Sequence, residues 1–207
     1  MRFALCVSNM CSRNIGPYPR LSTYLSALLV CTTFGCGHAK SHLEKQVLNL
    51  TLQPLGKVSK ANIQQVGTTL NRTFNVRLSI EKPIPFPKQD WYAPRKRWLA
   101  DPIVATPTKE RTLYLASVDI SRPAHGQANF GVLGCANGNA IVSTFRMKGN
   151  KDLLDKIAIH EIGHTFGLPH CPNKGCIMQD LVGHASTLDG STTFCPSCRA
   201  KIGQWLK

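Results

Sequence analysis

Residues 160–171 read HEIGHTFGLPHC, and this stretch carries most of what the sequence says about chemistry. His160 and His164 are four residues apart, so in a helix their imidazoles lie on one face, one turn apart, and can reach a single metal ion. Glu161 directly follows His160, which places its carboxylate beside the metal, where a base for a reacting water must stand. The spacing therefore predicts a helix that carries a catalytic metal site.

The residues after this helix predict a third ligand. Gly167 falls where the helix must stop, because glycine takes the left-handed conformation that reverses the chain. His170 then returns to the metal and leaves the fourth position of a zinc ion open for water. An isolated HExxH is a weak signal, since it also occurs on helices whose histidines are solvated or packed in a core. At average residue usage, however, all five fixed positions coincide in about one chain in 10⁵, so a metal site is the favoured interpretation.

The cysteines near the C-terminus predict a second metal site. Cys171 and Cys176 have four residues between them, and Cys195 and Cys198 have two. Two chelating pairs joined by a loop are the usual layout of a closed, structural four-cysteine zinc site. The same four residues could instead form two disulfides if the chain is exported.

The segment before the motif begins with a strand, a helix and a second strand. Apolar residues at every second position predict a strand over 48–52, which Pro54 ends. Ser59 is expected to cap a helix, and period-two alternation resumes in residues 74–80. This order resembles a crossover unit, in which the two strands are parallel.

The middle of the chain adds another helix and several strands. Residues 81–90 are rich in proline and end regular structure, and a helix is expected over 91–99. Further strands are predicted over 113–120, 130–136 and 139–147. The Asn137-Gly138 pair between the last two favours a tight hairpin.

The motif helix completes the predicted fold. It is expected to run from about residue 151 to 167, with Asn150 and Asp152 suited to its positive N-terminal end. The fold class is therefore α/β (α+β), with a mixed twisted sheet packed by helices. A chain of 207 residues is long enough for one domain with a real core, which we expect over residues 40–207.

Residues 1–39 have features of an export signal. Arg13 and Arg20 precede a mostly apolar stretch over 21–34 that has the length of a signal-peptide core and is short for a membrane span. Lipid attachment at Cys31 or Cys36 would make the chain a lipoprotein. An exported or lipid-anchored protein is the favoured prediction, and a disordered start on a cytoplasmic protein is the alternative.

The charge is strongly positive, with 25 Lys and Arg against 11 Asp and Glu and a formal net charge of +14. Such a balance favours anionic partners such as nucleic acid, acidic lipid or acidic peptides. The basic residues are dispersed, however, apart from one modest cluster at Arg95, Lys96 and Arg97. A solvated basic surface is therefore favoured over a dedicated anion-binding face, and no specific nucleic acid is expected.

The combined motifs resemble a known family. Metzincin metallopeptidases share HExxHxxGxxH and a methionine in a tight turn below the metal, and this chain has Met178 two residues after Cys176. A cysteine directly after the third histidine, a second cysteine, the methionine and a distal CxxC pair resemble the archaemetzincin (archaelysin) branch. The close resemblance covers about residues 160–198.

The resemblance implies a metzincin-like fold and a zinc metallopeptidase that hydrolyses peptide bonds. By this resemblance two zinc ions bind per chain, a peptide or protein substrate lies along residues 130–136 as an extra strand, and we expect a monomer. Two alternatives stay open: a zinc-binding protein with negligible turnover, and a basic nucleic-acid-binding zinc module. The implied site residues are His160, His164 and His170 for catalytic zinc, Glu161 as general base, Cys171, Cys176, Cys195 and Cys198 for structural zinc, and Met178 as the turn methionine.

Overall fold

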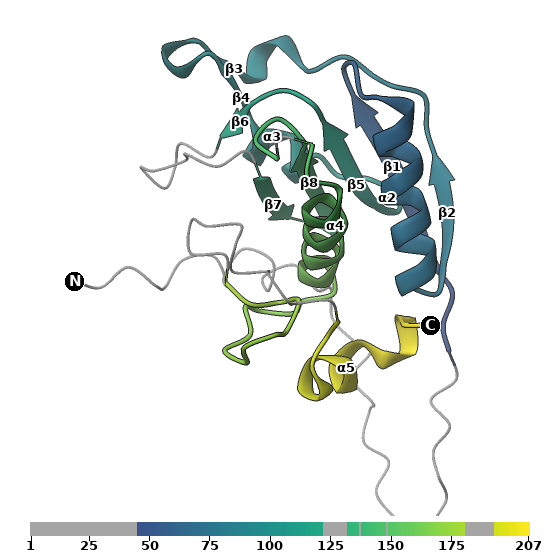
Figure 1. The fold of residues 1–207 in the computed structure, drawn as a ribbon. Coiled ribbons are helices and arrows are strands. Elements are labelled where there is room, and N and C mark those ends of the chain that lie inside the picture. The colour runs from purple at the N-terminus through teal and green to yellow at the C-terminus, as the bar shows by residue number, and fades with distance from the viewer. Residues whose placement is uncertain (1–44, 122–131, 137, 148, 181–192) are drawn as a thin grey trace, which may run out of the picture.

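The structure is a computed structural model that describes residues 45–121, 132–136, 138–147, 149–180 and 193–207 (Figure 1). The predicted export segment and its candidate anchors, Cys31 and Cys36, lie outside the described residues. The proposed domain start at residue 40 therefore stays a prediction. In the described part of the chain, every helix is too short or too polar to cross a membrane.

The main sheet has five strands in the order β2-β1-β5-β8-β7. Its first four strands are parallel, and β7 pairs with β8 as the antiparallel edge strand. The parallel pairing of β1 with β2 confirms the predicted crossover, and the mixed sheet confirms the predicted fold class. The strands are β1 (Leu48–Leu55), β2 (Val76–Ile80), β5 (Arg111–Ala116), β7 (Val132–Ala136) and β8 (Asn139–Ser143).

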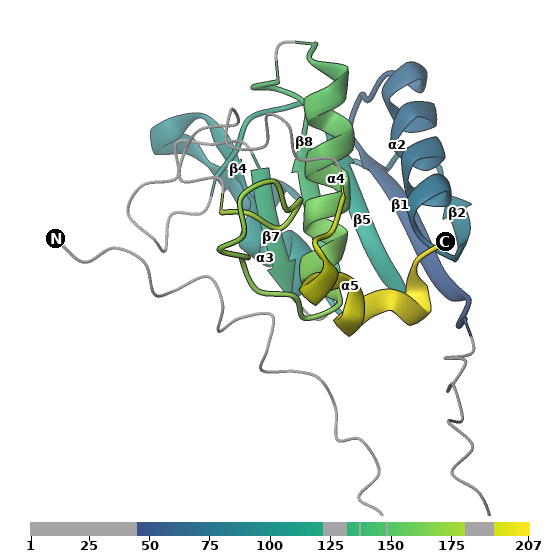
Figure 2. The same cartoon turned by 60° about the horizontal axis from the view of Figure 1, so that its bottom comes forward.

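Helices cover the main sheet on both faces. On one face, α2 (Lys60–Thr73) and α4 (Lys151–Thr165) lie side by side (Figure 2). The short helix α3 (Ala100–Ala105) packs on the other face. Alternating residues of β5 pack into two hydrophobic clusters, one on each face of the sheet. Leu113 packs with residues of α2 and α4, whereas Tyr114 belongs to the cluster around α3. This alternation follows from the period of two in a strand that is buried on both sides.

The strand β1 runs past Pro54, so the prediction that proline ends it is wrong. Pro54 is paired with Leu115 of β5, and its carbonyl accepts from the Ile84 N–H (3.1 Å). Its backbone thus faces the side of β1 where β2 has already ended at Ile80. In the described part of the chain, no strand on that side needs the N–H that proline lacks, so β1 continues without losing a sheet hydrogen bond.

A second, three-stranded sheet replaces the helix predicted over 91–99. The strand β3 (Trp91–Tyr92) pairs antiparallel with β4 (Arg97–Leu99), and β4 pairs parallel with β6 (Ile120–Ser121). Trp91 and Trp98 contact each other across the hairpin at a centroid distance of 5.1 Å. This aromatic pair favours paired strands over a helix, and Lys96 takes the left-handed conformation (φ 50°) that turns the chain.

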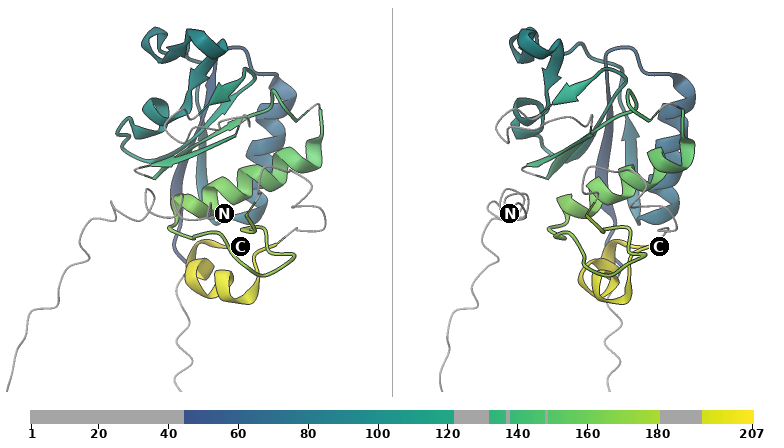
Figure 3. Two further views of the ribbon diagram at one scale, coloured as in Figure 1. Left: turned by 90° about the vertical axis from the view of Figure 1, so that its left-hand side faces the viewer. Right: turned by 60° about the vertical axis from the view of Figure 1, so that its left-hand side comes forward.

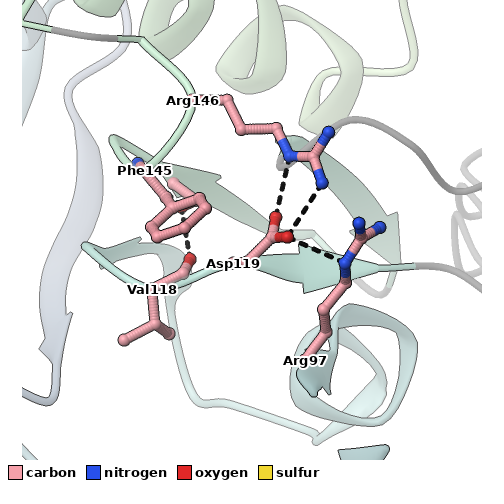
Figure 4. Close-up of polar contacts among 6 residues, drawn as sticks. Arg97, Val118, Asp119, Phe145 and Arg146 are labelled. Carbon is pink, nitrogen blue, oxygen red and sulfur yellow. Dashed lines mark hydrogen bonds and ion pairs between the residues drawn. The ribbon is translucent and has the colours of Figure 1, made fainter. Parts of the chain in front are cut away.

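An ion-pair network joins this small sheet to the main domain. Arg97 Nε lies 2.8 Å from Asp119 Oδ2, and Arg146, which follows β8, donates to both carboxylate oxygens at 2.9 and 2.8 Å (Figure 4). One member of the predicted basic cluster is thus engaged with an acidic side chain of the same chain. Arg95 and Lys96 are exposed.

The two long helices begin at the predicted caps. The Ser59 hydroxyl accepts from the Asn62 N–H (3.1 Å) at the start of α2. The Asn150 side chain accepts from the Leu153 N–H (3.0 Å) at the start of α4. Each bond satisfies a backbone donor that the first turn of a helix leaves open.

The C-terminal segment returns to the main domain after α5 (Pro196–Ile202) and a short 3-10 turn (Gly203–Trp205). Backbone bonds run from Asn75 N to Trp205 O (2.8 Å) and from Lys207 N to Thr73 O (3.2 Å). Figure 3 shows α5 beside the C-terminal end of α4. The end of the chain is therefore fixed next to the end of the motif helix.

Candidate active site

The three motif histidines meet at one point. One ring nitrogen from each of His160, His164 and His170 lies within 4.8 Å of the others. The ring centroids are 4.6 to 5.4 Å apart. The Nε2 atoms of His160 and His164 are 2.9 Å apart. Two nitrogen ligands at 2.0–2.1 Å from one zinc ion stand about 3 Å apart, so this spacing fits a shared metal.

Backbone carbonyls hold two of the imidazoles from behind. Nδ1 of His160 lies 2.8 Å from Ile177 O, and Nδ1 of His164 lies 2.8 Å from Leu168 O. A carbonyl can only accept, so each Nδ1 carries the proton and each Nε2 presents a lone pair to the common point. Two buried lone pairs that face each other at 2.9 Å repel unless a cation stands beside them.

Burial keeps these imidazoles neutral. Desolvation lowers the pKa of His160 to about 4 and that of His164 to about 3. Their carbonyl partners oppose this shift but do not overcome it. Both rings are therefore in the neutral form that binds a metal at neutral pH.

The end of α4 forms the turn that the glycine predicted. Gly167 has φ +83°, its N–H donates to His164 O (2.8 Å), and the Leu168 N–H donates to Gly163 O (3.2 Å). These two bonds define a Schellman motif. The helix ends at Thr165, two residues before the predicted limit. The same turn presents the Leu168 carbonyl to His164 and sends the chain back toward His170.

His170 is the most exposed of the three histidines, with its side chain 25% exposed. Its Nδ1 lies 3.6 Å from Asp180 Oδ1. A carboxylate behind a histidine is a common orienting partner at metal sites. Nothing in the sequence motif predicts Asp180, because it follows the methionine by two residues and belongs to no ligand spacing.

Glu161 is buried beside the histidines. Its side chain is 2% exposed, and Oε1 lies 3.8 Å from His160 Nε2. The carboxylate is therefore next to the common point of the histidines and outside the group of three ligand atoms.

Met178 and Gly163 fit together beneath the site. Met178 is fully buried, and a Cβ added at Gly163 would overlap its Sδ and stand 3.2 Å from its Cε. The helix can lie on the methionine only because position 163 has no side chain. Sequence reasoning missed Gly163, although a glycine inside a predicted helix is the available signal for a close contact.

The four C-terminal cysteines also converge. One sulfur from each lies within 4.8 Å of the others, and all four are free thiols in the structure. Sγ of Cys171 is 3.7 Å from that of Cys195, and Sγ of Cys176 is 3.8 Å from that of Cys198. Tetrahedral zinc with bonds of about 2.3 Å separates its sulfur ligands by about 3.8 Å, so the group fits one zinc ion.

The two candidate metal groups share a short piece of backbone. Cys171 directly follows His170, and its N–H donates to Met178 O (2.8 Å). Ile177, whose carbonyl holds His160, directly follows Cys176. A shift of the cysteine group would therefore move the backbone that positions His160 and His170.

Comparisons with known proteins find similarity over the segment that carries the site. The family model described as Peptidase family M54 matches residues 130–204. The archaemetzincin of Methanopyrus kandleri is 32% identical over 103 residues, which cover 47% of this chain and 58% of that protein. The archaemetzincin of Haloarcula marismortui is 20% identical over 173 residues, which cover 75% of this chain and 99% of that protein.

Solved structures extend the similarity over most of the described chain. An archaemetzincin from Archaeoglobus fulgidus, complexed with malonate, matches with a TM-score of 0.63 and 26% identity over 75% of this chain and 100% of that one. A zinc-dependent peptidase from Methanocorpusculum labreanum matches with a TM-score of 0.56 and 25% identity over 74% of this chain and 99% of that one.

The fold, the converging histidines and the M54 match define the chain as a zinc-dependent metallopeptidase. Within that class the two curated relatives and the Archaeoglobus fulgidus structure reported above carry the name archaemetzincin. The chain is similar to the archaemetzincins in sequence and in fold, which confirms the family resemblance of its motifs.

Proposed function

We propose that this chain hydrolyses peptide bonds at the site formed by His160, His164 and His170. The observation that carries the proposal is the convergence of three imidazole nitrogens within 4.8 Å, with a buried carboxylate oxygen 3.8 Å from one of them. A zinc ion bound there would polarise the scissile carbonyl and make a water acidic enough to react near neutral pH.

Glu161 is the proposed general base. Its carboxylate accepts a proton from the attacking water and passes it to the amine that leaves when the peptide bond breaks. The burial of Glu161 beside His160 favours this role, because a buried carboxylate next to the reacting atoms needs no reorganisation of solvent to take the proton.

The cysteine group is the proposed structural site, which makes two zinc ions per chain. The four thiolates would hold a zinc ion and would leave no position on it for water or substrate. Met178 is the proposed turn methionine, and it supports the helix under the histidines.

A peptide substrate is proposed to bind along β7. This strand is the edge of the main sheet, so its outer backbone groups have no strand beside them among the described residues. An extended peptide adds to such an edge through main-chain hydrogen bonds. The chain is proposed to act as a monomer.

It is also proposed to be exported, or anchored through Cys31 or Cys36. Mass analysis of the mature N-terminus would test for cleavage and for an attached lipid.

The experiment compares wild type with Glu161→Gln, which keeps the size and polarity of the side chain but removes the base. We expect about two zinc ions per chain in both proteins and a loss of peptide cleavage of about 10² to 10⁴-fold in the variant. The exposed Glu81 supplies a matched control, because Glu81→Gln should keep full activity.

Two outcomes would overturn the proposal. Unchanged cleavage in Glu161→Gln would remove the assigned base. Two bound zinc ions without cleavage of any peptide in wild type would favour a binding protein, and salt-dependent binding of polyanions in that case would favour a nucleic-acid module.

A further inference from the structure

Arg111, the first residue of β5, reaches the C-terminal end of the motif helix. Its Nη1 donates to the backbone carbonyl of Thr165, and its Cζ lies 4.9 Å from the centroid of the Phe166 ring. Thr165 and Phe166 directly follow His164. Arg111 comes from a different element, 54 residues earlier in the chain than Thr165.

The end of α4 is a favourable place for this cation. The last carbonyls of a helix lack intrahelical partners and carry the negative end of the helix dipole. Burial lowers the pKa of Arg111, but an arginine remains charged in proteins. Its contacts with a carbonyl and an aromatic face offset the cost of removing the guanidinium from water.

Phe166 is held by further aromatic contacts. The ring of Trp205 stacks on it with a centroid distance of 4.7 Å and an interplanar angle of 15°. Phe74 contacts it at 5.6 Å. Trp205 is itself fixed to the main domain, because its carbonyl accepts from the Asn75 N–H. Phe166 is therefore in contact with β5, with Phe74 directly after α2, and with the C-terminal turn.

The turn that orients His164 and leads to His170 begins at the backbone of Phe166. Phe166 stands between His164 and Gly167, and the turn that follows presents the Leu168 carbonyl to His164 Nδ1 at 2.8 Å. The same turn sets the path to His170. A shift at Phe166 would therefore move the partner of one candidate ligand and the backbone of another.

We propose that Arg111 is a positioning residue for the histidine metal site, acting through the Thr165 carbonyl and the Phe166 ring. The inference rests on the proposed metal-binding role of the three histidines. Arg111 does not take part in the chemistry. It sets the geometry, and thereby the affinity, of the histidine site without acting on the cysteine site.

The test measures metal affinity in Arg111→Met and Arg111→Lys. Cobalt(II) is the probe, because thiolate-to-cobalt charge-transfer bands report the cysteine site separately from the weaker visible bands of a histidine site. We expect Arg111→Met to weaken cobalt binding at the histidine site by about 10 to 100-fold, as is typical when an orienting partner of a ligand is lost. Arg111→Lys should recover part of this loss, because it keeps the charge but not the planar guanidinium.

Arg146→Met is the matched control, since it also removes a partly buried arginine that binds a polar partner. It should lower stability without changing the cobalt affinity of the histidine site. With the zinc protein, kcat should fall more than KM increases in Arg111→Met. If that variant does not fold, Phe166→Leu gives a second route, with the same expected loss at the histidine site.

The outcomes separate this proposal from the proposed function. Equal histidine-site affinity in wild type and Arg111→Met would overturn the positioning role, as would an equal loss at both metal sites. Failure of the proposed function would instead appear in wild type, as absent cobalt binding by the histidines or absent cleavage.

Discussion

At the scale of single residues, Gly163 leaves no room for a side chain on the motif helix. A Cβ there would overlap Met178 Sδ and stand 3.3 Å from Phe194 Cε1. We expect Gly163→Ala to lower the free energy of unfolding, because overpacking costs about 1–3 kcal/mol and the better helix propensity of alanine returns about 1 kcal/mol at most. Urea denaturation of the zinc-loaded protein measures the difference.

Gly203 is the matched glycine for this test. It has ordinary right-handed helical dihedral angles and nothing within 4 Å of an added Cβ. Gly203→Ala should therefore be neutral or stabilising by about 0.4–1 kcal/mol. Combining Gly163→Ala with Met178→Val should recover part of the loss, because the shorter side chain makes room. Additive effects in the double variant would show that the two residues do not compete for the same space.

At the scale of elements, the two ends of α4 have separable roles. Its first turn is closed by the Asn150 side chain, and its last turn lies at the histidines. We expect Asn150→Ala to lower the free energy of unfolding by about 0.5–2 kcal/mol through loss of the cap, with no change in metal affinity. Thermal unfolding and cobalt titration of the same sample check both parts.

The Ser59 cap of α2 provides the control for the Asn150 variant of α4. Ser59→Ala removes a similar bond from a helix that carries no ligand. The two cap variants should resemble each other in stability and in metal affinity. A loss of histidine-site affinity in Asn150→Ala alone would mean that the whole helix, and not only its last turn, sets the ligand geometry.

At the scale of the whole molecule, the cysteine group is expected to support the histidine group. Ile177, which holds His160, follows Cys176, and Cys171 follows His170. We expect the zinc content of Cys198→Ser to fall by more than one ion per chain on dialysis. Loss of the metal at the cysteine group should also loosen the backbone behind two histidines and weaken zinc binding there. Zinc content measured by elemental analysis checks this coupling.

Ser197→Ala is the control for that change. The Ser197 hydroxyl lies 3.1 Å from Cys195 Sγ but supplies no thiolate, so both zinc ions should remain. A Cys198→Ser protein that keeps one zinc ion and full peptide cleavage would show that the two sites are independent.

The parts of the site that depend on local spacing were predictable from the sequence. The separation of His160 from His164 places them on one helical face, and the Asn150 cap and the Gly167 turn depend on residues within a few positions. The cysteine pairs belong to the same class, since each pair is a short chelate. These features need only the helix period and the conformational range of glycine.

Tertiary structure alone decided how the site is held. The carbonyl behind His160 comes from Ile177, 17 residues away, and the cation behind Thr165 comes from Arg111, 54 residues away. The hairpin over 91–99 and the continuation of β1 through Pro54 likewise depend on which strand lies alongside. Such contacts are set by the packing of the sheet and helices, which the local periodicity of the sequence does not specify. The sequence by itself therefore determined the candidate metal ligands, and the tertiary structure determined which groups orient them.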